Sequence, residues 1–286
     1  MANGDVKLGM HASLWAAEWT REAAELAIPE AAEYGLQCIE FPLLVPEGVD
    51  APHSAKLFEK YGIEPTCSLC LPDDKMAAFK PEAAQAFVTK ALDKAAETGS
   101  KFLGGVTFGA LGYRSGKPPT KAEYENIVKA LKPTAQHARR LGITLGIEPC
   151  NRYETHLINT STQAMMLQDM IDEPNVTIHF DTYHMNIEEK GIGTALRKCA
   201  GRTSYVHMSE SDRGVPGTGT IDWNDVYRAL AESDFKGKLV VESFVALPPE
   251  IAGALCVWRP VAKDRQELLQ KGVPFLYGLG KAHGLF

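Results

Sequence analysis

The chain has 286 residues, of which 45% are hydrophobic and 23% are charged, and its formal net charge at pH 7 is −6. A chain of this length and composition can bury a large core without disulfides, as soluble globular proteins do. The acidic balance argues against a nucleic-acid-binding protein, which needs a basic surface to follow the phosphates, and it offers no attraction to anionic membranes.

The apolar stretches and the cysteines indicate the compartment. The apolar stretches are all far shorter than the ~20 residues of a membrane helix, and residues 1–7 contain no apolar run of the signal-peptide type. Cys67 and Cys70 form a C-x-x-C pair, but they lie inside the apolar run TCSLCL and no second pair completes a zinc site. We therefore expect these two thiols to belong to the core, and we expect a cytoplasmic protein.

Eight short runs of β-strand character alternate with longer segments in which apolar residues recur at helical spacing. In chain order the β-like runs are VKLGMH from Val6, QCIEF from Gln37, IEPTCSLCL from Ile63, KFLGGVTF from Lys101, ITLGIE from Ile143, NVTIHFD from Asn175, SYVHMSE from Ser204 and KLVVES from Lys238. Helical segments between them include residues 22–34, 81–98, 121–141 and 222–233.

Helix-terminating and helix-initiating residues lie at the junctions between these runs. Thr160 or Ser161 precedes one apolar helical run as a candidate N-cap, and Asp222 precedes another. A glycine, the residue that most often ends a helix, is found before five of the β-like runs. These glycines are Gly35, Gly62, Gly99, Gly142 and Gly237.

Eight strand-then-helix units without a linker predict an α/β fold, a single-domain (β/α)8 (TIM) barrel over residues 1–286. No low-complexity segment or proline- and serine-rich linker marks a second domain. The competing architecture is a doubly wound open sheet. That fold is expected to carry a glycine-rich phosphate-binding turn after an early strand, and the sequence shows none.

Acidic residues and one histidine occupy the ends of the last four predicted strands. They are Glu148, Asp181, His207 and Glu242. Functional residues of such barrels lie at the carboxyl ends of strands, so these four side chains can converge on one point at the barrel mouth. Three carboxylates and an imidazole suit one divalent cation, Mn²⁺, Mg²⁺ or Co²⁺, whereas thiolates would indicate zinc.

A second group of polar and aromatic residues follows the same strands. Glu154, His184 and Arg213 lie in the loops after three of them, where a barrel binds its substrate. His179 shares parity with Asp181 and should point inward one layer lower, as a structural residue or a partner of a metal ligand. Trp15 and Trp19 follow the first strand and Phe244 follows the eighth; Trp19 and Phe244 are candidates to pack against a sugar.

The segments around these residues resemble the ketose 3-epimerases, the group of D-tagatose, D-psicose (D-allulose) and L-ribulose 3-epimerases. The resemblance covers most of the chain, from GMHASLWAAEW near the start to VWRPV near the end, and is densest between Gly146 and Phe244. Its most specific string is DTYHMNIEE, in register with IEPCNRYETHLINT, VHMSESDRGVPGTG and VVESF.

The resemblance implies a (β/α)8 barrel that holds one Mn²⁺-like ion and inverts C3 of a free ketose. Carried over by motif, the metal ligands are Glu148, Asp181, His207 and Glu242, and the two glutamates are also the acid/base pair. Glu154, His184 and Arg213 match positions that bind the ketose around O1 to O3, and Trp19 and Phe244 match its apolar wall. Members of this family are commonly homodimers or homotetramers, which we therefore expect here.

The sequence departs from better-known members of the group in two stretches. One contains His11, at the end of the first strand, and the other is the loop FGALGYRSGKPP, residues 108–119. Both should face the distal carbons of the substrate. The preferred ketose therefore stays open, whether tagatose, psicose or fructose, or ribulose.

The residues suit proton transfer at C3. A metal that binds O2 and O3 as a Lewis acid stabilises the enediolate that forms when the C3 proton leaves. Two carboxylates on opposite sides of C3 then serve as base and acid. We hypothesise that Glu242 deprotonates one epimer and Glu148 reprotonates the opposite face, with the roles exchanged in the reverse direction.

Four alternatives remain open at this point. An aldose–ketose isomerase of the hydroxypyruvate isomerase type could use the same metal site, because fold alone does not separate the two reactions. A metal-dependent hydrolase would need more ligands and a basic groove, and a sugar-binding module would not need two metal-held carboxylates. A phosphorylated substrate could use the N–H groups of GVPGTG after Arg213, although these glycines are more simply a tight loop that lets Arg213 reach inward.

Overall fold

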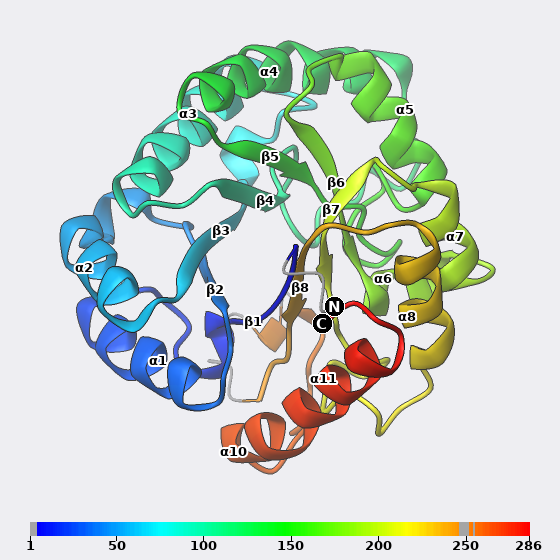
Figure 1. Ribbon diagram of the computed structural model, residues 1–286. Helices are drawn as coiled ribbons and strands as arrows, with labels where there is room; N and C mark the ends of the chain where they lie inside the picture. The colour runs from blue at the N-terminus through cyan, green and yellow to red at the C-terminus, as the bar shows by residue number, and fades with distance from the viewer. Residues whose placement is uncertain (1–4, 246–251, 254) are drawn as a thin grey trace.

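The computed structural model describes residues 5–245, 252–253 and 255–286. Eight parallel strands form a closed barrel in chain order, and the last strand pairs with the first (Figure 1). The predicted (β/α)8 barrel is therefore confirmed. The strands are β1 Val6–His11, β2 Cys38–Pro42, β3 Glu64–Cys70, β4 Phe102–Val106, β5 Thr144–Ile147, β6 Val176–Asp181, β7 Thr203–His207 and β8 Gly237–Val241.

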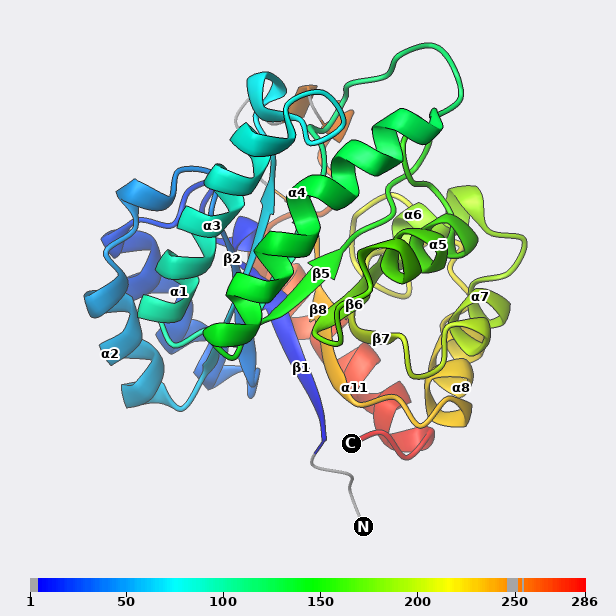
Figure 2. The ribbon, with the colours of Figure 1, turned by 90° about the horizontal axis from the view of Figure 1, so that it is seen from above.

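Helices surround the barrel and connect successive strands (Figures 1 and 2). The α-helices are α1 Arg21–Glu33, α2 Ala51–Tyr61, α3 Pro81–Glu97, α4 Lys121–Arg140, α5 Ser161–Ile171, α6 Thr182–Glu188, α7 Ile192–Lys198, α8 Trp223–Glu232, α10 Arg265–Glu267 and α11 Val273–Ala282. Short 3-10 turns η1 Ala12–Leu14, η2 Pro46–Gly48 and η3 Asp73–Lys75 and a π-helical turn η4 Leu268–Gly272 complete the described elements.

The helix ends follow the sequence signals with one exception. Thr160 caps α5 through a hydrogen bond from the main-chain N–H of Gln163, and Asp222 caps α8 in the same way. Four of the five predicted glycines have positive φ next to a helix end: Gly35, Gly62, Gly99 and Gly142.

The prediction for Gly237 was wrong. Helix α8 ends at Glu232, the left-handed residue after it is Asp234 with φ 49°, and Gly237 is the first residue of β8. A Cβ on Gly237 would lie 2.0 Å from the carbonyl oxygen of Ser204. The glycine therefore permits close pairing between β7 and β8 rather than ending a helix.

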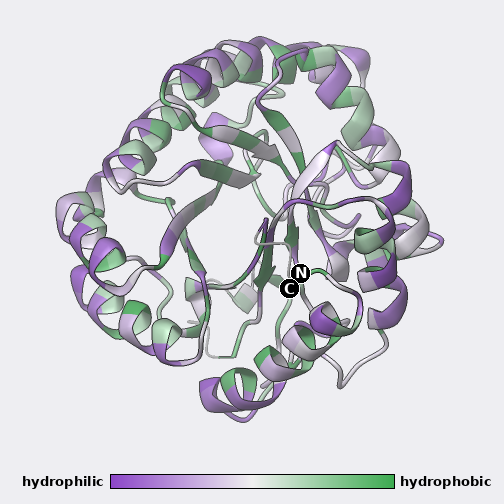
Figure 3. Cartoon of the chain, in the orientation of Figure 1, coloured by the Kyte–Doolittle hydropathy of each residue, from purple (hydrophilic) through white to green (hydrophobic). Residues whose placement is uncertain are grey.

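The apolar residues gather between the strands and the inner faces of the helices. Figure 3 shows green, hydrophobic residues on the strands and inner helix faces and purple, hydrophilic residues on the outer helix faces. This is the pattern expected of helices that bury one stripe against a sheet. No helix among the described residues has the length and apolar character needed to cross a membrane.

The centre of the barrel is filled by aromatic rings, not hollow. The rings of Phe102 and Tyr205 stack with centroids 3.9 Å apart, and the Tyr205 hydroxyl lies 2.7 Å from Thr66 Oγ1. Glycines make room for this layer, because a Cβ on Gly104 or Gly146 would lie within 2.8 Å of the Phe102 ring. This layer forms the floor beneath the carboxyl ends of the strands, where the site residues lie.

Candidate active site

The four predicted metal ligands come from four consecutive strands. Asp181 and His207 are the last residues of β6 and β7, while Glu148 and Glu242 follow β5 and β8 by one residue. All four are buried. Because the strands are parallel, their carboxyl ends meet at one rim of the barrel, which brings these side chains together.

The imidazole of His207 is the centre of this group. Its Nδ1 lies 3.5 Å from Glu148 Oε1 and 3.6 Å from Glu242 Oε1. One ligand atom each from Glu148, Asp181 and His207 lies within 4.8 Å of the other two. The predicted convergence of the four side chains is therefore present in the structure.

Two buried atoms of this group lack a hydrogen-bond partner. They are His207 Nδ1 and Asp181 Oδ2. The other oxygen of Asp181 accepts a hydrogen bond of 2.8 Å from the main-chain N–H of Tyr183, at the start of α6. Buried polar atoms without partners are rare, and these two belong to residues that gather at the same rim of the barrel. The donor set, rich in oxygen with one imidazole nitrogen, fits a divalent cation such as Mn²⁺ or Mg²⁺.

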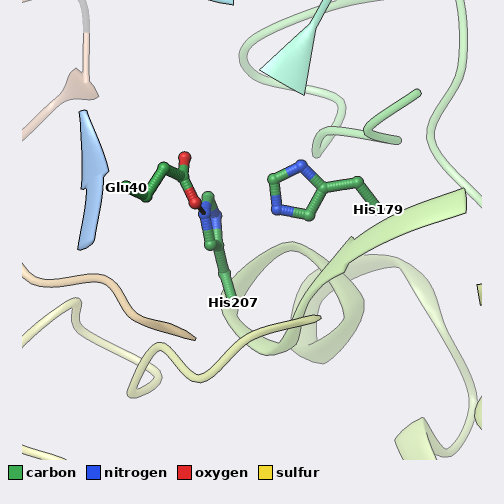
Figure 4. Close-up of side chains that lie close together, drawn as sticks. All are labelled: Glu40, His179 and His207. Atoms are coloured by element: carbon green, nitrogen blue, oxygen red, sulfur yellow. Dashed lines mark hydrogen bonds and ion pairs between the residues drawn. The ribbon is translucent and has the colours of Figure 1, made fainter. Parts of the chain in front are cut away.

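Glu40 orients His207 from the opposite side. Its Oε2 lies 2.7 Å from His207 Nε2, and its side chain is fully buried on β2 (Figure 4). With Nε2 bound to Glu40, Nδ1 is left to face the cluster of carboxylates. This is the carboxylate–histidine arrangement that commonly fixes a metal-binding imidazole.

His179 lies next to this pair, one layer below the rim, as predicted from its parity. Its ring centroid is 4.1 Å from that of His207, and its Nδ1 accepts a hydrogen bond of 3.1 Å from the main-chain N–H of Gly105. Glu40, His179 and His207 could themselves be considered a metal-binding group (Figure 4). Glu40 and His207 are already joined to each other by a hydrogen bond, so the group of Glu148, Asp181, His207 and Glu242 is the better cation site.

The electrostatic surroundings favour positive charge at this position. Burial raises the pKa values of Glu148, Asp181 and Glu242 above their ordinary range. Burial alone would lower the pKa of His207, but the carboxylates of Glu40 and Glu242 outweigh it and raise that pKa well above its usual value. A bound cation would relieve the same concentration of negative charge.

The predicted substrate-binding residues lie beside this cluster. Arg213 Nη2 is 3.4 Å from Glu154 Oε1 and 3.1 Å from His184 Nε2, and all three side chains are buried. The Arg213 guanidinium lies over the rings of Tyr183 and Phe244, at 4.2 and 4.9 Å from their centroids. Its Nε and Nη1 have no hydrogen-bond partner. Glu154, His184 and Arg213 thus form a polar wall, and Arg213 offers it two unused hydrogen-bond donors.

Asn151 joins two members of this wall. Its side-chain Nδ2 donates to Glu154 Oε1 at 2.9 Å, and its main-chain N–H donates to His184 Nδ1 at 3.2 Å. Burial lowers the pKa of His184 to about 3, so this ring is neutral at physiological pH. Its Nε2 lies 3.8 Å from Asp181 Oδ2, so this ring is the member of the wall that contacts the cation-site residues.

These residues surround a cavity of about 370 Å³ at the barrel mouth, a volume in the range of small-molecule sites. His11 lines it, as do Ala110 and Leu111 from the predicted variable loop 108–119. Cys70 also reaches the cavity wall, whereas Cys67 is fully buried, so the C-x-x-C pair belongs mainly to the core. The remaining site residues on the wall are Glu148, Glu154, His184, His207, Arg213, Glu242 and Phe244.

Trp19 does not line the described part of this cavity. Its ring stacks on Phe41 and Phe58, with centroids 4.8 and 5.9 Å away, and its indole N–H donates to Ser54 Oγ at 3.1 Å. These contacts bury it between β2 and α2, where it packs as a core residue. Phe244, in contrast, reaches the cavity.

Glu40 and Asn151 are residues that the sequence analysis missed. Glu40 is the one acidic residue in the run QCIEF, and a charge inside a buried strand is a signal in itself. Asn151 precedes Glu154 by three residues within a loop, where an asparagine is ordinary. Its contacts depend on the folded loop, so the sequence pattern gave no basis for selecting it.

The chain is similar to known proteins over most of its length. Residues 28–273 match the family model described as xylose isomerase-like TIM barrel. The chain is 34% identical to the L-ribulose 3-epimerase of Methylomonas sp. (strain DH-1), over 95% of this chain and 96% of that protein. It is 32% identical to the ketose 3-epimerase of Arthrobacter globiformis, over 92% of this chain and 93% of that protein.

Solved structures agree with the sequence relatives. The crystal structure of a D-allulose 3-epimerase from Methylomonas sp. in complex with D-allulose superposes with a TM-score of 0.91 at 32% identity. The match covers 97% of this chain and 98% of that one. Full-length similarity at this level, together with the family model, establishes the relationship. The chain belongs to the xylose isomerase-like TIM barrel family and, within it, to the ketose 3-epimerases.

Proposed function

We propose that this protein is a metal-dependent isomerase that epimerises free ketoses at C3 through an enediolate. The observation that carries the proposal is the convergence of Glu148 and Glu242 on His207 Nδ1, at 3.5 and 3.6 Å, beside a buried wall of polar donors. Two carboxylates around one reacting carbon are what inversion needs, because one must remove a proton and the other must return one.

The two glutamates exchange roles between the two directions. Glu242 removes the C3 proton of one epimer, and Glu148 delivers a proton to the opposite face; in reverse, Glu148 is the base. Burial raises the pKa of both carboxyl groups, which supports a protonated acid next to an ionised base at neutral pH. After the forward reaction Glu242 is protonated and Glu148 is ionised, which is the state from which the reverse reaction begins.

Glu148, Asp181, His207 and Glu242 would hold the cation, for which we propose Mn²⁺, with Co²⁺ or Mg²⁺ as replacements. When bound, such an ion supplies Lewis-acid stabilisation of negative charge on the ketose oxygens, an effect worth several kcal/mol. Glu154, His184 and Arg213 then orient the ketose near O1 to O3, and Phe244 contacts its carbon skeleton. Trp19 is not part of this set, because its ring lies in the core.

A free sugar is favoured over a phosphorylated one by the loop after β7. Two of its glycine main-chain N–H groups are already used: Gly214 N donates to Asp212 Oδ1 at 3.0 Å, and Gly217 N donates to Glu210 Oε2 at 2.9 Å. They are therefore not available to a phosphate group. The D-allulose bound to the Methylomonas sp. neighbour is likewise a free sugar.

The variants E148Q and E242Q test the two-carboxylate scheme. Gln keeps an oxygen that can bind a cation but cannot accept or deliver the proton. We expect kcat to fall by about 10²–10⁴-fold in each variant. In D₂O, E148Q should still exchange the C3 proton of the epimer that Glu242 deprotonates, without inversion, and E242Q should exchange only the other epimer. The measurements are NMR of C3 deuterium and chromatography of the products.

Glu173→Gln is the matched control. Glu173 is a largely buried carboxylate that accepts a hydrogen bond from Gln136 and precedes β6, at the end of the barrel away from the mouth. E173Q should epimerise at the wild-type rate. Bound metal is measured in every variant, so that a lost cation is not mistaken for a lost base. Epimerisation near the wild-type rate by E148Q or E242Q would refute the scheme.

Product analysis separates the proposed reaction from its alternative. With added Mn²⁺, D-fructose should yield psicose, whereas an aldose–ketose isomerase would yield glucose or mannose. Extending the assay to tagatose and ribulose identifies the preferred ketose, which we expect His11 and residues 108–119 to influence because they line the cavity.

We further propose a cytoplasmic enzyme that forms a homodimer or homotetramer. All six cysteines lie in the described residues and are free thiols, which suits a reducing compartment. Size-exclusion chromatography with light scattering measures the oligomeric state, for which a monomer would contradict the proposal.

A further inference from the structure

A buried carboxylate lies at the centre of the loop between β7 and α8. The side chain of Glu210 is fully buried and accepts four N–H hydrogen bonds, two on each oxygen. Oε1 accepts from the main chain of Ser211 at 2.8 Å and of Ile221 at 3.2 Å. Oε2 accepts from the main chain of Gly217 and from the Trp223 indole, both at 2.9 Å. One side chain therefore ties together the start, middle and end of this loop.

The loop is built to fit this carboxylate closely. A Cβ on Gly219 would lie 2.4 Å from Glu210 Oε1, so only glycine permits the approach. Burial opposes the charged form of Glu210, but the N–H groups of Ser211, Trp223, Gly217 and Ile221 outweigh it and lower its pKa. Glu210 is thus ionised at neutral pH and holds its four donors by charge-assisted hydrogen bonds.

The same loop fixes the backbone of Arg213. Its N–H donates to the carbonyl oxygen of Glu210 at 2.9 Å, and its own carbonyl oxygen accepts from Ser243 Oγ at 2.7 Å. Arg213 has φ 61°, a left-handed conformation that non-glycine residues seldom adopt. Such a conformation persists only where surrounding contacts enforce it. The Glu210 side chain contributes by holding the main chain on both sides of Arg213, at Ser211 and Gly217.

We propose that Glu210 is a positioning residue for ketose binding: it does not touch the substrate, but it holds Arg213 in the conformation that directs the guanidinium into the cavity. This inference rests on the proposed function for the role of Arg213. The loop then resembles an anion-binding site in which the anion is the protein's own Glu210 carboxylate, surrounded by N–H donors.

Glu210→Gln is the most direct test. In Gln an NH₂ group replaces one oxygen, and in either orientation it faces two N–H donors that have lost their acceptor. We expect the dissociation constant of a bound ketose, measured by calorimetry on the Mn²⁺-loaded protein, to rise about ten- to a hundredfold. KM should rise with it more than kcat falls, while the affinity for Mn²⁺ stays that of the wild type. Gly219→Ala places a methyl group against the same carboxylate and should also raise the dissociation constant of the ketose.

Glu173→Gln again serves as the control, because it removes a buried carboxylate that precedes β6, at the end of the barrel away from the mouth. It should lower Tm without changing ketose affinity. If E210Q and G219A bind the ketose as the wild type does, or if E173Q weakens binding equally, the inference is wrong. Should E210Q fail to fold, G219A decides the matter alone. Absence of epimerisation by the wild type would refute the proposed function instead, and the calorimetric comparison would still test Glu210.

Discussion

Glu40 orients His207 although it is not itself one of the predicted site residues. It lies on β2, far along the chain from His207, and the two side chains meet only because the barrel closes. Burial opposes its charge, but His207 outweighs that effect and lowers the pKa of Glu40, so the carboxylate is ionised. An ionised partner at Nε2 keeps the hydrogen of His207 on that nitrogen and leaves Nδ1 for a cation.

We predict that Glu40→Gln weakens metal binding. The amide is a poorer acceptor for the imidazole N–H, so His207 loses basicity and orientation, and the dissociation constant for Mn²⁺ should rise about 10–100-fold. Calorimetric titration of the metal-free protein measures this directly and needs no turnover. Glu64→Gln, at the other end of the barrel in β3, should leave the constant unchanged; an E40Q protein with wild-type Mn²⁺ affinity would contradict the assignment.

At the scale of elements, the ends of helices were predictable because their signals are local. Thr160 and Asp222 cap the helices that follow them, and the glycines before four strands adopt positive φ. Gly237 was misassigned because a glycine that ends a helix and one that permits a close strand pair look alike in sequence. The partners of Glu40, Asn151 and Trp19 were not predictable, since they depend on which strands and loops become neighbours.

Helix α4 offers a test of this local control. Thr120 and Glu123 form a reciprocal capping box at its first turn, with Thr120 Oγ1 accepting from the Glu123 N–H and Glu123 accepting from the Thr120 N–H. Thr120→Ala should lower the free energy of unfolding by about 1 kcal/mol, measured by urea denaturation.

The control for that measurement is Thr194→Ala, an exposed position inside α7 that caps no helix. Its effect should stay within about 0.5 kcal/mol. Equal losses in the two variants would show that the capping box of α4 does not contribute to stability. Ketose affinity should be unchanged in both, because neither residue reaches the cavity.

For the whole molecule, a cation at the rim would join the ends of four strands. A ligand that binds only the folded state stabilises it, by about 2.7 kcal/mol at a concentration 100 times its dissociation constant. We therefore predict that Mn²⁺ raises Tm by several degrees and that a chelator reverses the shift. Differential scanning fluorimetry measures it, with NaCl at the same ionic strength as the control. No shift with Mn²⁺, Co²⁺ or Mg²⁺ would argue against a resident metal.

The stacked rings of Phe102 and Tyr205 give the barrel a solid floor beneath His179. A cavity closed below communicates with solvent only at the rim, so a sugar departs through the opening by which it arrived. The two epimers consequently compete for one opening and one binding site. Accumulating product must then slow its own formation.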